Sequence, residues 1–159
     1  MRNKFFNALK NATPLAMIGW ALIILAFVTL CSEAEASPFS PDHARNGVIR
    51  VDRCDGGLIS EHVFDLAMSQ AQGAEIRVAG TMYSACTLAL AFDNVTVNAA
   101  HTTWCFHAAS VDGVIDRRET LAMWEMYPQA VRDLLPSPLV IGLEYHCLRG
   151  EVVAEAMAQ

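Results

Sequence analysis

Fold class is most visible in the segment Glu75-Ile-Arg-Val-Ala-Gly-Thr-Met-Tyr-Ser-Ala-Cys86. Its first five residues alternate charged and apolar side chains, a pattern typical of a β-strand. Gly80 then marks a sharp connection. Residues Ser84–Phe92 are small and apolar throughout, which predicts a buried helix. A strand that leads into a buried helix is the repeating unit of an α/β sheet.

The same alternation of strands and helices extends on both sides of this segment. Upstream, Gly47–Val51 predicts a strand, and Leu58–Ala71 predicts a helix that Ser60 would cap. Downstream, Asn94–Ala99 and Thr102–His107 predict two further strands. We therefore expect an α/β domain with a mostly parallel sheet that is flanked by helices.

Two more helices are predicted in the carboxyl-terminal third. Asp116 begins a capping pair, and a helix should run from it towards Leu135 with a bend near Pro128. Ser137-Pro138 places a capping residue before a proline, which predicts a last helix that reaches about Leu148.

The amino end has the three parts of a secretory signal. Residues 1–10 carry three basic side chains and no acid, Leu15–Cys31 is an apolar run of 17 residues, and Ala34-Glu35-Ala36 is a small-x-small site. The apolar run is also near the lower limit for spanning a bilayer. Residues 1–36 are therefore predicted to be a signal peptide cut after Ala36, or an uncleaved inner-membrane anchor through residues 15–31. Either reading predicts an exported, periplasmic domain.

Residues 37–46 contain two prolines and predict a linker, so that residues 47–159 form the working domain. Without residues 1–36 the net charge falls from −6 to −7. An acidic domain repels the phosphate backbone, so no nucleic-acid partner is expected. Lys10 is the last lysine of the chain, and the eight basic residues after Ala36 are all arginine.

Four cysteines follow the signal, at Cys54, Cys86, Cys105 and Cys147. An even number in an oxidising compartment favours up to two disulfides, and three pairings of four cysteines are open. Buried free thiols are the alternative. No C-x-x-C pair is present, so a zinc ribbon or a thioredoxin-type site is not expected, and we expect no metal site.

Two features of the sequence itself suggest a ligand-binding or catalytic site. Gly56-Gly57 follows a predicted strand, where paired glycines can turn the chain and present N–H groups to a ligand. Ser84 stands at the start of the buried helix, beside N–H groups that are free to bind an anion. Ser84 is therefore a candidate nucleophile with an oxyanion site beside it. The alternative is an ordinary helix cap, which is the commonest use of serine there.

A serine nucleophile needs a base, and the absence of lysine from the exported domain leaves histidine. Ligand sites in α/β sheets gather at the carboxyl ends of the strands. His107 ends a predicted strand and is the best candidate, whereas His62 is predicted to be exposed on the early helix. The remaining histidines are His43, His101 and His146.

In order and nearly in spacing, these motifs resemble those of the Clp protease proteolytic subunit and crotonase superfamily. The closer likeness is to its exported, uncharacterised branch, in which Ser-Ala-Cys is common, as at Ser84-Ala85-Cys86. The resemblance covers about ninety residues and implies a trimmed Clp protease/crotonase-like fold. It further implies that Ser84 attacks the acyl carbon, that His107 takes its proton, and that the N–H groups of Gly57 and Ala85 form the oxyanion hole.

The resemblance also implies an acid, which would orient the histidine. Arg132-Asp133-Leu-Leu-Pro-Ser137 is similar to the context of the family's aspartate, so Asp133 is the candidate. The stretch between His107 and Asp133 is much shorter than in the family. Asp112 and Asp116 lie nearer in sequence and are alternatives.

The family has a further strand and helix before the glycine pair, and residues 37–46 leave no room for them. Such trimming leaves a sheet edge to be covered, which favours an inactive protein or one that works as a homo-oligomer. The expected function is an exported serine hydrolase, most simply a peptidase, that acts on a peptide or acyl substrate without a cofactor. The alternative is a non-catalytic binding or assembly protein that keeps the fold. An acyl-thioester binder is disfavoured, because coenzyme A is a cytoplasmic cofactor.

Overall fold

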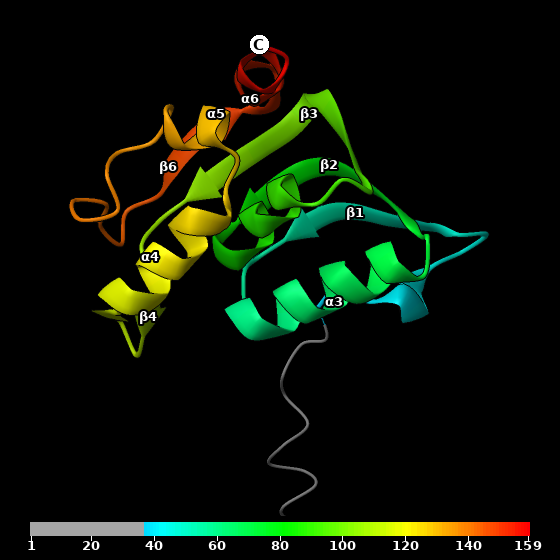
Figure 1. The fold of residues 1–159 in the computed structure, drawn as a ribbon, viewed down its shortest axis with the longest axis horizontal. Coiled ribbons are helices and arrows are strands. Elements are labelled where there is room, and N and C mark those ends of the chain that lie inside the picture. Colours follow the sequence, from blue (N-terminus) through cyan, green and yellow to red (C-terminus); the bar gives the residue numbers. More distant parts are fainter. Residues whose placement is uncertain (1–36) are drawn as a thin grey trace, which may run out of the picture. The chain divides into compact units, whose positions relative to one another are not determined.

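A computed structural model describes residues 37–159, and Figure 1 shows their ribbon. The predicted signal or anchor in residues 1–36 lies outside the described residues. Among residues 37–159, no helix combines the length and the apolar character that crossing a membrane requires. The segment predicted as a linker contains a short 3-10 helix, η1 (Pro41–His43), and packs on the domain: Phe39 is fully buried, and the Ser69 hydroxyl donates to its carbonyl at 2.6 Å.

Four strands form the central sheet in the order β1-β2-β3-β6. Their bounds are Val48–Cys54 (β1), Glu75–Tyr83 (β2), Val95–Phe106 (β3) and His146–Arg149 (β6). β1 pairs with β2 and β2 with β3 in parallel, whereas β6 runs antiparallel to β3. The predicted α/β class and mostly parallel sheet are therefore confirmed.

The two strands predicted over residues 94–107 are one continuous strand, β3. Its pairing with β2 shifts between Val78, which lies opposite Val97, and Gly80, which lies opposite Thr102. Gly80 has φ +94°, and a Cβ at this position would collide with the carbonyl oxygen of Asp52 on β1. A glycine therefore allows the irregular register without breaking the sheet.

The helix α3 (Ile59–Ala71) and the 3-10 helix η2 (Ser84–Ala91) follow β1 and β2. α3 buries His62, Leu66 and Ser69, which lie at helical spacing on one face. The predicted cap Ser60 lies inside the helix, because the N-cap of α3 is Leu58, which makes no side-chain hydrogen bond. η2 is buried from its second residue to its seventh, as predicted for this apolar run. In Figure 1, α3 lies below the strands and α6 (Gly150–Met157) above them.

The predicted helix after Asp116 is confirmed as α4 (Arg117–Met126). The Asp116 carboxylate accepts the N–H groups of Arg118 and Glu119 at 2.9 and 3.1 Å, which is an N-cap bond pair. The predicted bend is a break: Tyr127 ends α4, and after Pro128 the chain forms only the short α5 (Gln129–Arg132).

The predicted last helix, from Ser137 to Leu148, is wrong. Its first part forms turns, in which Leu139 and Val140 are more than two-thirds exposed. Its last part is β6, which pairs along the free edge of β3 and places Cys147 opposite Cys105. The pairing with a strand forty residues away outweighs the local helical spacing of the apolar residues.

A small hairpin lies between β3 and α4. It consists of β4 (Ser110–Val111) and β5 (Val114–Ile115), which pair antiparallel. The turn residues Asp112 and Gly113 both have positive φ, 50° and 76°. This Asp-Gly pair is typical of a tight hairpin turn.

All four cysteines of the described chain are paired. Cys54 at the end of β1 is bonded to Cys86 in η2, and Cys105 in β3 is bonded to Cys147 in β6. The prediction of up to two disulfides is confirmed, and the pairing, which the sequence left open, is settled in this structure.

Candidate active site

The three parallel strands end at the same edge of the sheet, and each is followed by a predicted site residue. Gly57 follows β1, Ser84 follows β2, and His107 follows β3 directly. All three line one cavity of about 360 Å³. The cavity is also lined by Leu58, Ile59, Ser60, Ala109, Ser110, Val111, Asp116, Glu119 and Met123. Carboxyl ends of parallel strands are where α/β sheets place their ligand sites.

Ser84 has an unusual backbone at this edge. Its φ is +54°, a left-handed conformation that few residues with a side chain adopt. The capping position of η2 is held by Tyr83 rather than Ser84, so Ser84 is not the ordinary helix cap of the alternative reading. Within residues 37–159 its hydroxyl makes no hydrogen bond, and Ser84 lines the cavity. A strained turn between a strand and a helix, with a free hydroxyl, is the backbone arrangement that presents nucleophilic serines.

Two side chains that sequence reasoning missed hold this turn. The Thr87 hydroxyl donates to the carbonyl oxygen of Ser84 at 2.6 Å. Since that uses the only proton of Thr87, the hydroxyl of Tyr127 donates to Thr87, also at 2.6 Å. Burial raises the pKa of Tyr127, which keeps the phenol protonated as a donor. Thr87 is the only hydroxyl in the apolar run 85–90, and that exception is a signal in the sequence.

The glycine pair lies against Ser84. Gly56 has φ +100°, and a Cβ on it would lie 3.0 Å from the Ser84 Cβ, which is tighter than nine in ten real contacts of this kind. Its N–H points to Cys86 Sγ at 3.0 Å. Glycine is therefore needed at residue 56 both for the backbone angle and for the close approach to the serine.

Two N–H groups at the site have no acceptor among residues 37–159. They belong to Gly57 and Ala85, the two predicted oxyanion-hole positions. Gly57 lines the cavity. Ala85 is fully buried directly after Ser84, and it does not line the cavity itself.

His107 is half-buried at the end of β3, and its Nδ1 atom is buried without a hydrogen-bond partner in the described chain. Burial lowers the pKa of His107 below its ordinary value, so the ring is neutral at pH 7 and able to accept a proton. The ring packs edge-on against Tyr145 with centroids 4.8 Å apart. Tyr145 packs in turn on Tyr83 at 5.1 Å, and so links the residue before Ser84 to the histidine. No sequence signal pointed to Tyr145, because it lies in the segment that was predicted to be helical.

Of the candidate acids, the structure brings only Asp116 to the cavity, together with Glu119 on α4. The Oδ1 atom of Asp116 accepts both capping N–H groups. Asp133 is exposed after α5, where it accepts a hydrogen bond from Gln129 at 2.6 Å, and it does not line the cavity. Asp112 is exposed in the hairpin turn. Within residues 37–159, no hydrogen bond joins Ser84 to His107 or an acid to His107.

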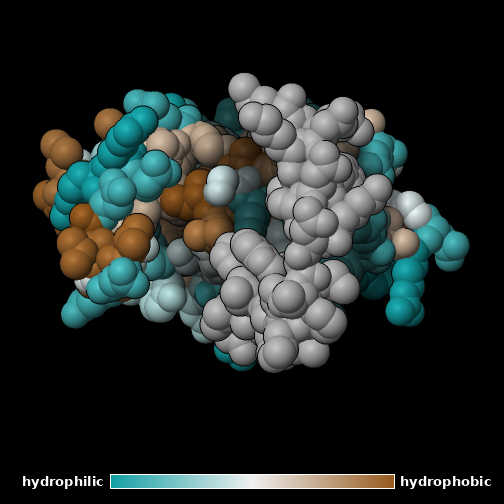
Figure 2. All heavy atoms as spheres, turned by 90° about the horizontal axis from the view of Figure 1, so that it is seen from below, coloured by the Kyte–Doolittle hydropathy of each residue, from teal (hydrophilic) through white to brown (hydrophobic). Residues whose placement is uncertain are grey.

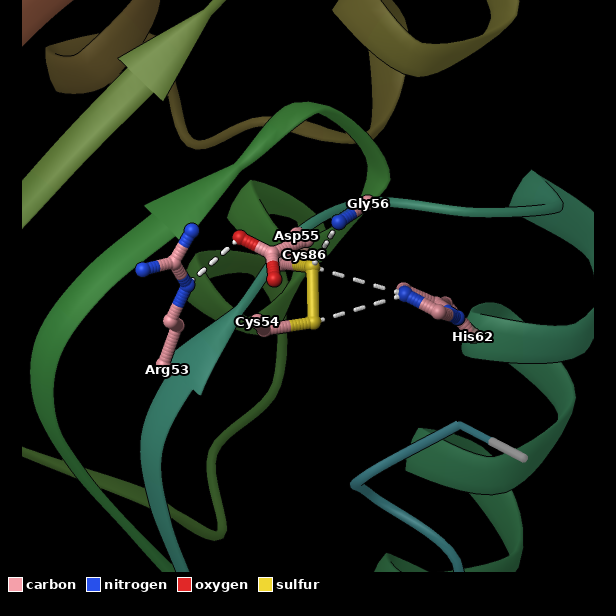
Figure 3. Close-up of polar contacts among 6 residues, drawn as sticks. All are labelled: Arg53, Cys54, Asp55, Gly56, His62 and Cys86. Atoms are coloured by element: carbon pink, nitrogen blue, oxygen red, sulfur yellow. Dashed lines mark hydrogen bonds and ion pairs between the residues drawn. A yellow bond between two sulfur atoms is a disulfide. The ribbon is translucent and has the colours of Figure 1, made fainter. Parts of the chain in front are cut away.

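The prediction that His62 is exposed is wrong. Its exposed fraction is 2%, and its ring faces the disulfide between Cys54 and Cys86 (Figure 3). The remaining histidines lie elsewhere: His43 in η1, His101 in β3 and His146 in β6.

Comparison with known proteins adds no family to this picture. No protein-family model, no curated protein and no solved structure matches the chain. The function must therefore be argued from the site itself.

Proposed function

We propose that this protein is an exported serine hydrolase, a peptidase or a related acyl-transfer enzyme, with a trimmed Clp protease/crotonase-like fold. One observation carries the proposal: Ser84, whose hydroxyl makes no hydrogen bond within residues 37–159, lies on a strained turn and shares a cavity with His107. The N–H groups of Gly57, which lines the same cavity, and of Ala85, directly after Ser84, have no acceptor among residues 37–159. A nucleophile, a base and oxyanion donors are the parts that acyl transfer needs.

In the proposed mechanism, neutral His107 takes the proton of the Ser84 hydroxyl as Oγ attacks the acyl carbon. The N–H groups of Gly57 and Ala85 donate to the oxyanion of the tetrahedral intermediate. His107 then gives its proton to the leaving group, and water releases the acyl group from Ser84 by the reverse sequence. Hydrogen bonds between catalytic groups are often absent before substrate binds, so the serine and histidine would meet in the substrate complex. The route uses no metal and no organic cofactor.

The acid that best supports this mechanism is Asp116. It lines the cavity with His107, and its Oδ2 atom is free of the capping bonds. Asp133, which the family resemblance implies, lies outside the cavity.

The substrate that fits the cavity is a peptide or acyl chain with apolar groups. Much of the lining is apolar, including Leu58, Val111 and Met123. Leu58, Val111 and Val114 are all more than 60% exposed. Figure 2 shows hydrophobic residues gathered at the left of the view, the side on which α4 and β4 lie in Figure 1. The two disulfides support an oxidising compartment, in line with an exported protein.

A second candidate function is a binding or assembly protein that keeps the fold without the chemistry. Two observations favour it. No hydrogen bond joins Ser84 to His107 in the described chain, and Asp133, the acid that the family resemblance implies, is exposed and bonded to Gln129 instead. In that case the same cavity binds its ligand and releases it unchanged.

Hydrolysis of activated esters by the purified protein separates the two candidates. We expect turnover that Ser84→Ala abolishes and His107→Ala lowers by about 100-fold or more. Ser110→Ala is the matched control, because Ser110 lines the same cavity and has no role in the mechanism. Turnover that is absent, or that survives Ser84→Ala, would contradict the hydrolase and leave the binding protein.

A further inference from the structure

A second chemical cluster lies beside the candidate active site. It consists of Cys54 at the end of β1, His62 on α3 and Cys86 in η2. All three side chains are buried, and their sulfur and nitrogen atoms lie within 4.8 Å of one another. Figure 3 shows the His62 ring reaching from its helix towards both sulfur atoms. The proposed hydrolase mechanism uses none of the three.

His62 is poorly satisfied where it lies. Its Nε2 atom is 3.5 Å from both Cys54 Sγ and Cys86 Sγ, and a disulfide sulfur is a weak acceptor. Its Nδ1 atom has no hydrogen-bond partner in residues 37–159. A buried polar ring with only such weak partners in the described chain is costly, and an apolar side chain would fill the space without that cost.

We propose that His62, Cys54 and Cys86 form a redox-gated binding site for a thiophilic cation such as Zn²⁺, closed by the disulfide and opened by its reduction. Zn²⁺ bonds to nitrogen at about 2.0–2.1 Å and to thiolate sulfur at about 2.3 Å, which in a tetrahedron places N and S roughly 3.5 Å apart. Both His62 Nε2 to Sγ distances have this value already. Only the two sulfur atoms must move apart to admit the ion.

The surroundings of the cluster suit thiolate ligands. The Gly56 N–H, 3.0 Å from Cys86 Sγ, would donate to the thiolate and stabilise its charge. Two thiolates and one imidazole select Zn²⁺ or Cu⁺ over Mg²⁺ or Ca²⁺. Three protein ligands leave one tetrahedral position for water or another small ligand.

The chemical steps balance with a dithiol as the reductant. The dithiol supplies two electrons and two protons, the S–S bond between Cys54 and Cys86 breaks, and the dithiol leaves as its own disulfide. The divalent ion then displaces both thiol protons and bonds to the two thiolates and to Nε2. Binding therefore releases two protons and strengthens as the pH rises.

The second disulfide, between Cys105 and Cys147, serves as an internal control for the proposed zinc site. Cys105 and Cys147 are also bonded, but among residues 37–159 the only cluster of three metal-ligand side chains is the one around His62. Reduction of Cys105–Cys147 should therefore create no comparable zinc site.

The test uses the full chain with Cys31, Cys105 and Cys147 replaced by serine or alanine, so that only the two proposed ligands remain as thiols. The protein is reduced with a phosphine, exchanged into anaerobic buffer and titrated with Co²⁺ and then Zn²⁺. We expect thiolate-to-cobalt absorption, displaced by one equivalent of Zn²⁺, and no binding by the oxidised protein. Absence of binding after reduction, or equal binding by both forms, would overturn the proposal.

The role of the histidine is tested separately with His62→Phe, which keeps the ring volume, and with His62→Cys, which restores a third ligand. We expect the first to weaken Zn²⁺ binding by more than the roughly 10–100-fold cost of losing an outer-shell partner, and the second to recover it. In the reduced protein with His62 intact, Zn²⁺ should shift the ¹⁵N resonance of Nε2. Unchanged Zn²⁺ affinity in His62→Phe would overturn the assignment of His62 as a ligand. An unmoved Nε2 resonance would also overturn it, and that measurement does not depend on whether a variant folds. None of these measurements depends on hydrolase activity.

Discussion

The backbone of Ser84 is held by side chains rather than by its own preference. A left-handed residue that is not glycine costs of order 1–3 kcal/mol and persists only where neighbours enforce it. Here Thr87 holds the Ser84 carbonyl, and Tyr127 holds Thr87, inside the core. The position of Ser84 directly after a strand was predictable, but the network was not, because Tyr127 lies 40 residues beyond Thr87.

Thr87→Val should destabilise the protein more than Tyr127→Phe. The valine removes the bond to Ser84 and leaves the buried Tyr127 hydroxyl unpaired, at a cost of about 1–3 kcal/mol, whereas the phenylalanine loses one bond worth about 1 kcal/mol. Urea unfolding monitored by circular dichroism measures both. Two variants within a few tenths of a kcal/mol of the wild type would show that the network does not hold the turn.

The pH dependence of activity should reflect the buried ring of His107. Only the neutral ring can act as a base, and burial lowers its pKa, so activity should persist as the pH falls below the ordinary value of 6.5 and be lost only at the lowered pKa. Tyr145→Ala uncovers the ring and should move the acid limb of kcat/KM back towards 6.5. An acid limb at or above 6.5 in the wild type would contradict this environment for the base.

Helices and strands that local sequence patterns specify were predicted correctly, whereas a strand that depends on long-range pairing was not. A β-branched run predicted β1, alternation predicted β2, and the capping aspartate predicted the start of α4. The helix expected over Ser137–Leu148 is absent, because β6 pairs with the free edge of β3 and is tied to it by Cys147. Such pairing depends on a distant partner strand, which no local window of sequence contains.

Asp116 caps α4, and the proposed mechanism gives its carboxylate a second role at the cavity. Asp116→Ala should remove the cap and lower the free energy of unfolding by about 1 kcal/mol, whereas Asp116→Asn keeps a capping oxygen and most of the stability. If the carboxylate also orients His107, Asp116→Asn should still lower kcat, while Asp133→Asn should not. Calorimetry and ester hydrolysis measure the two effects, and full activity in Asp116→Asn would leave Asp116 as a cap alone.

At the scale of the whole molecule, two disulfides support a small domain. They close separations of 32 and 42 residues, and each is worth about 3–4 kcal/mol by the chain-entropy estimate. The sequence predicted that the cysteines could pair and left three pairings open, because the pairing depends on which elements meet in the fold. The same limit applies to His62, whose burial follows from where α3 packs.

The edge disulfide should matter for stability more than for the site. Replacing Cys105 and Cys147 together with alanine should lower the free energy of unfolding by about 2–4 kcal/mol, because the unfolded chain regains its freedom. Ser84-dependent activity should remain below the new melting temperature, since neither cysteine lines the cavity. Unfolding in denaturant checks the first point, and an unchanged midpoint would show that β6 needs no covalent tie.

The central claim, that Ser84 is an activated nucleophile, is tested most directly by covalent labelling with a fluorophosphonate probe. We predict a single adduct that peptide mapping by mass spectrometry locates at Ser84, that is absent in Ser84→Ala, and that forms much more slowly in His107→Ala. Ser110→Ala should label like the wild type. A folded protein that gains no adduct at Ser84, or gains it equally fast without His107, would contradict the account.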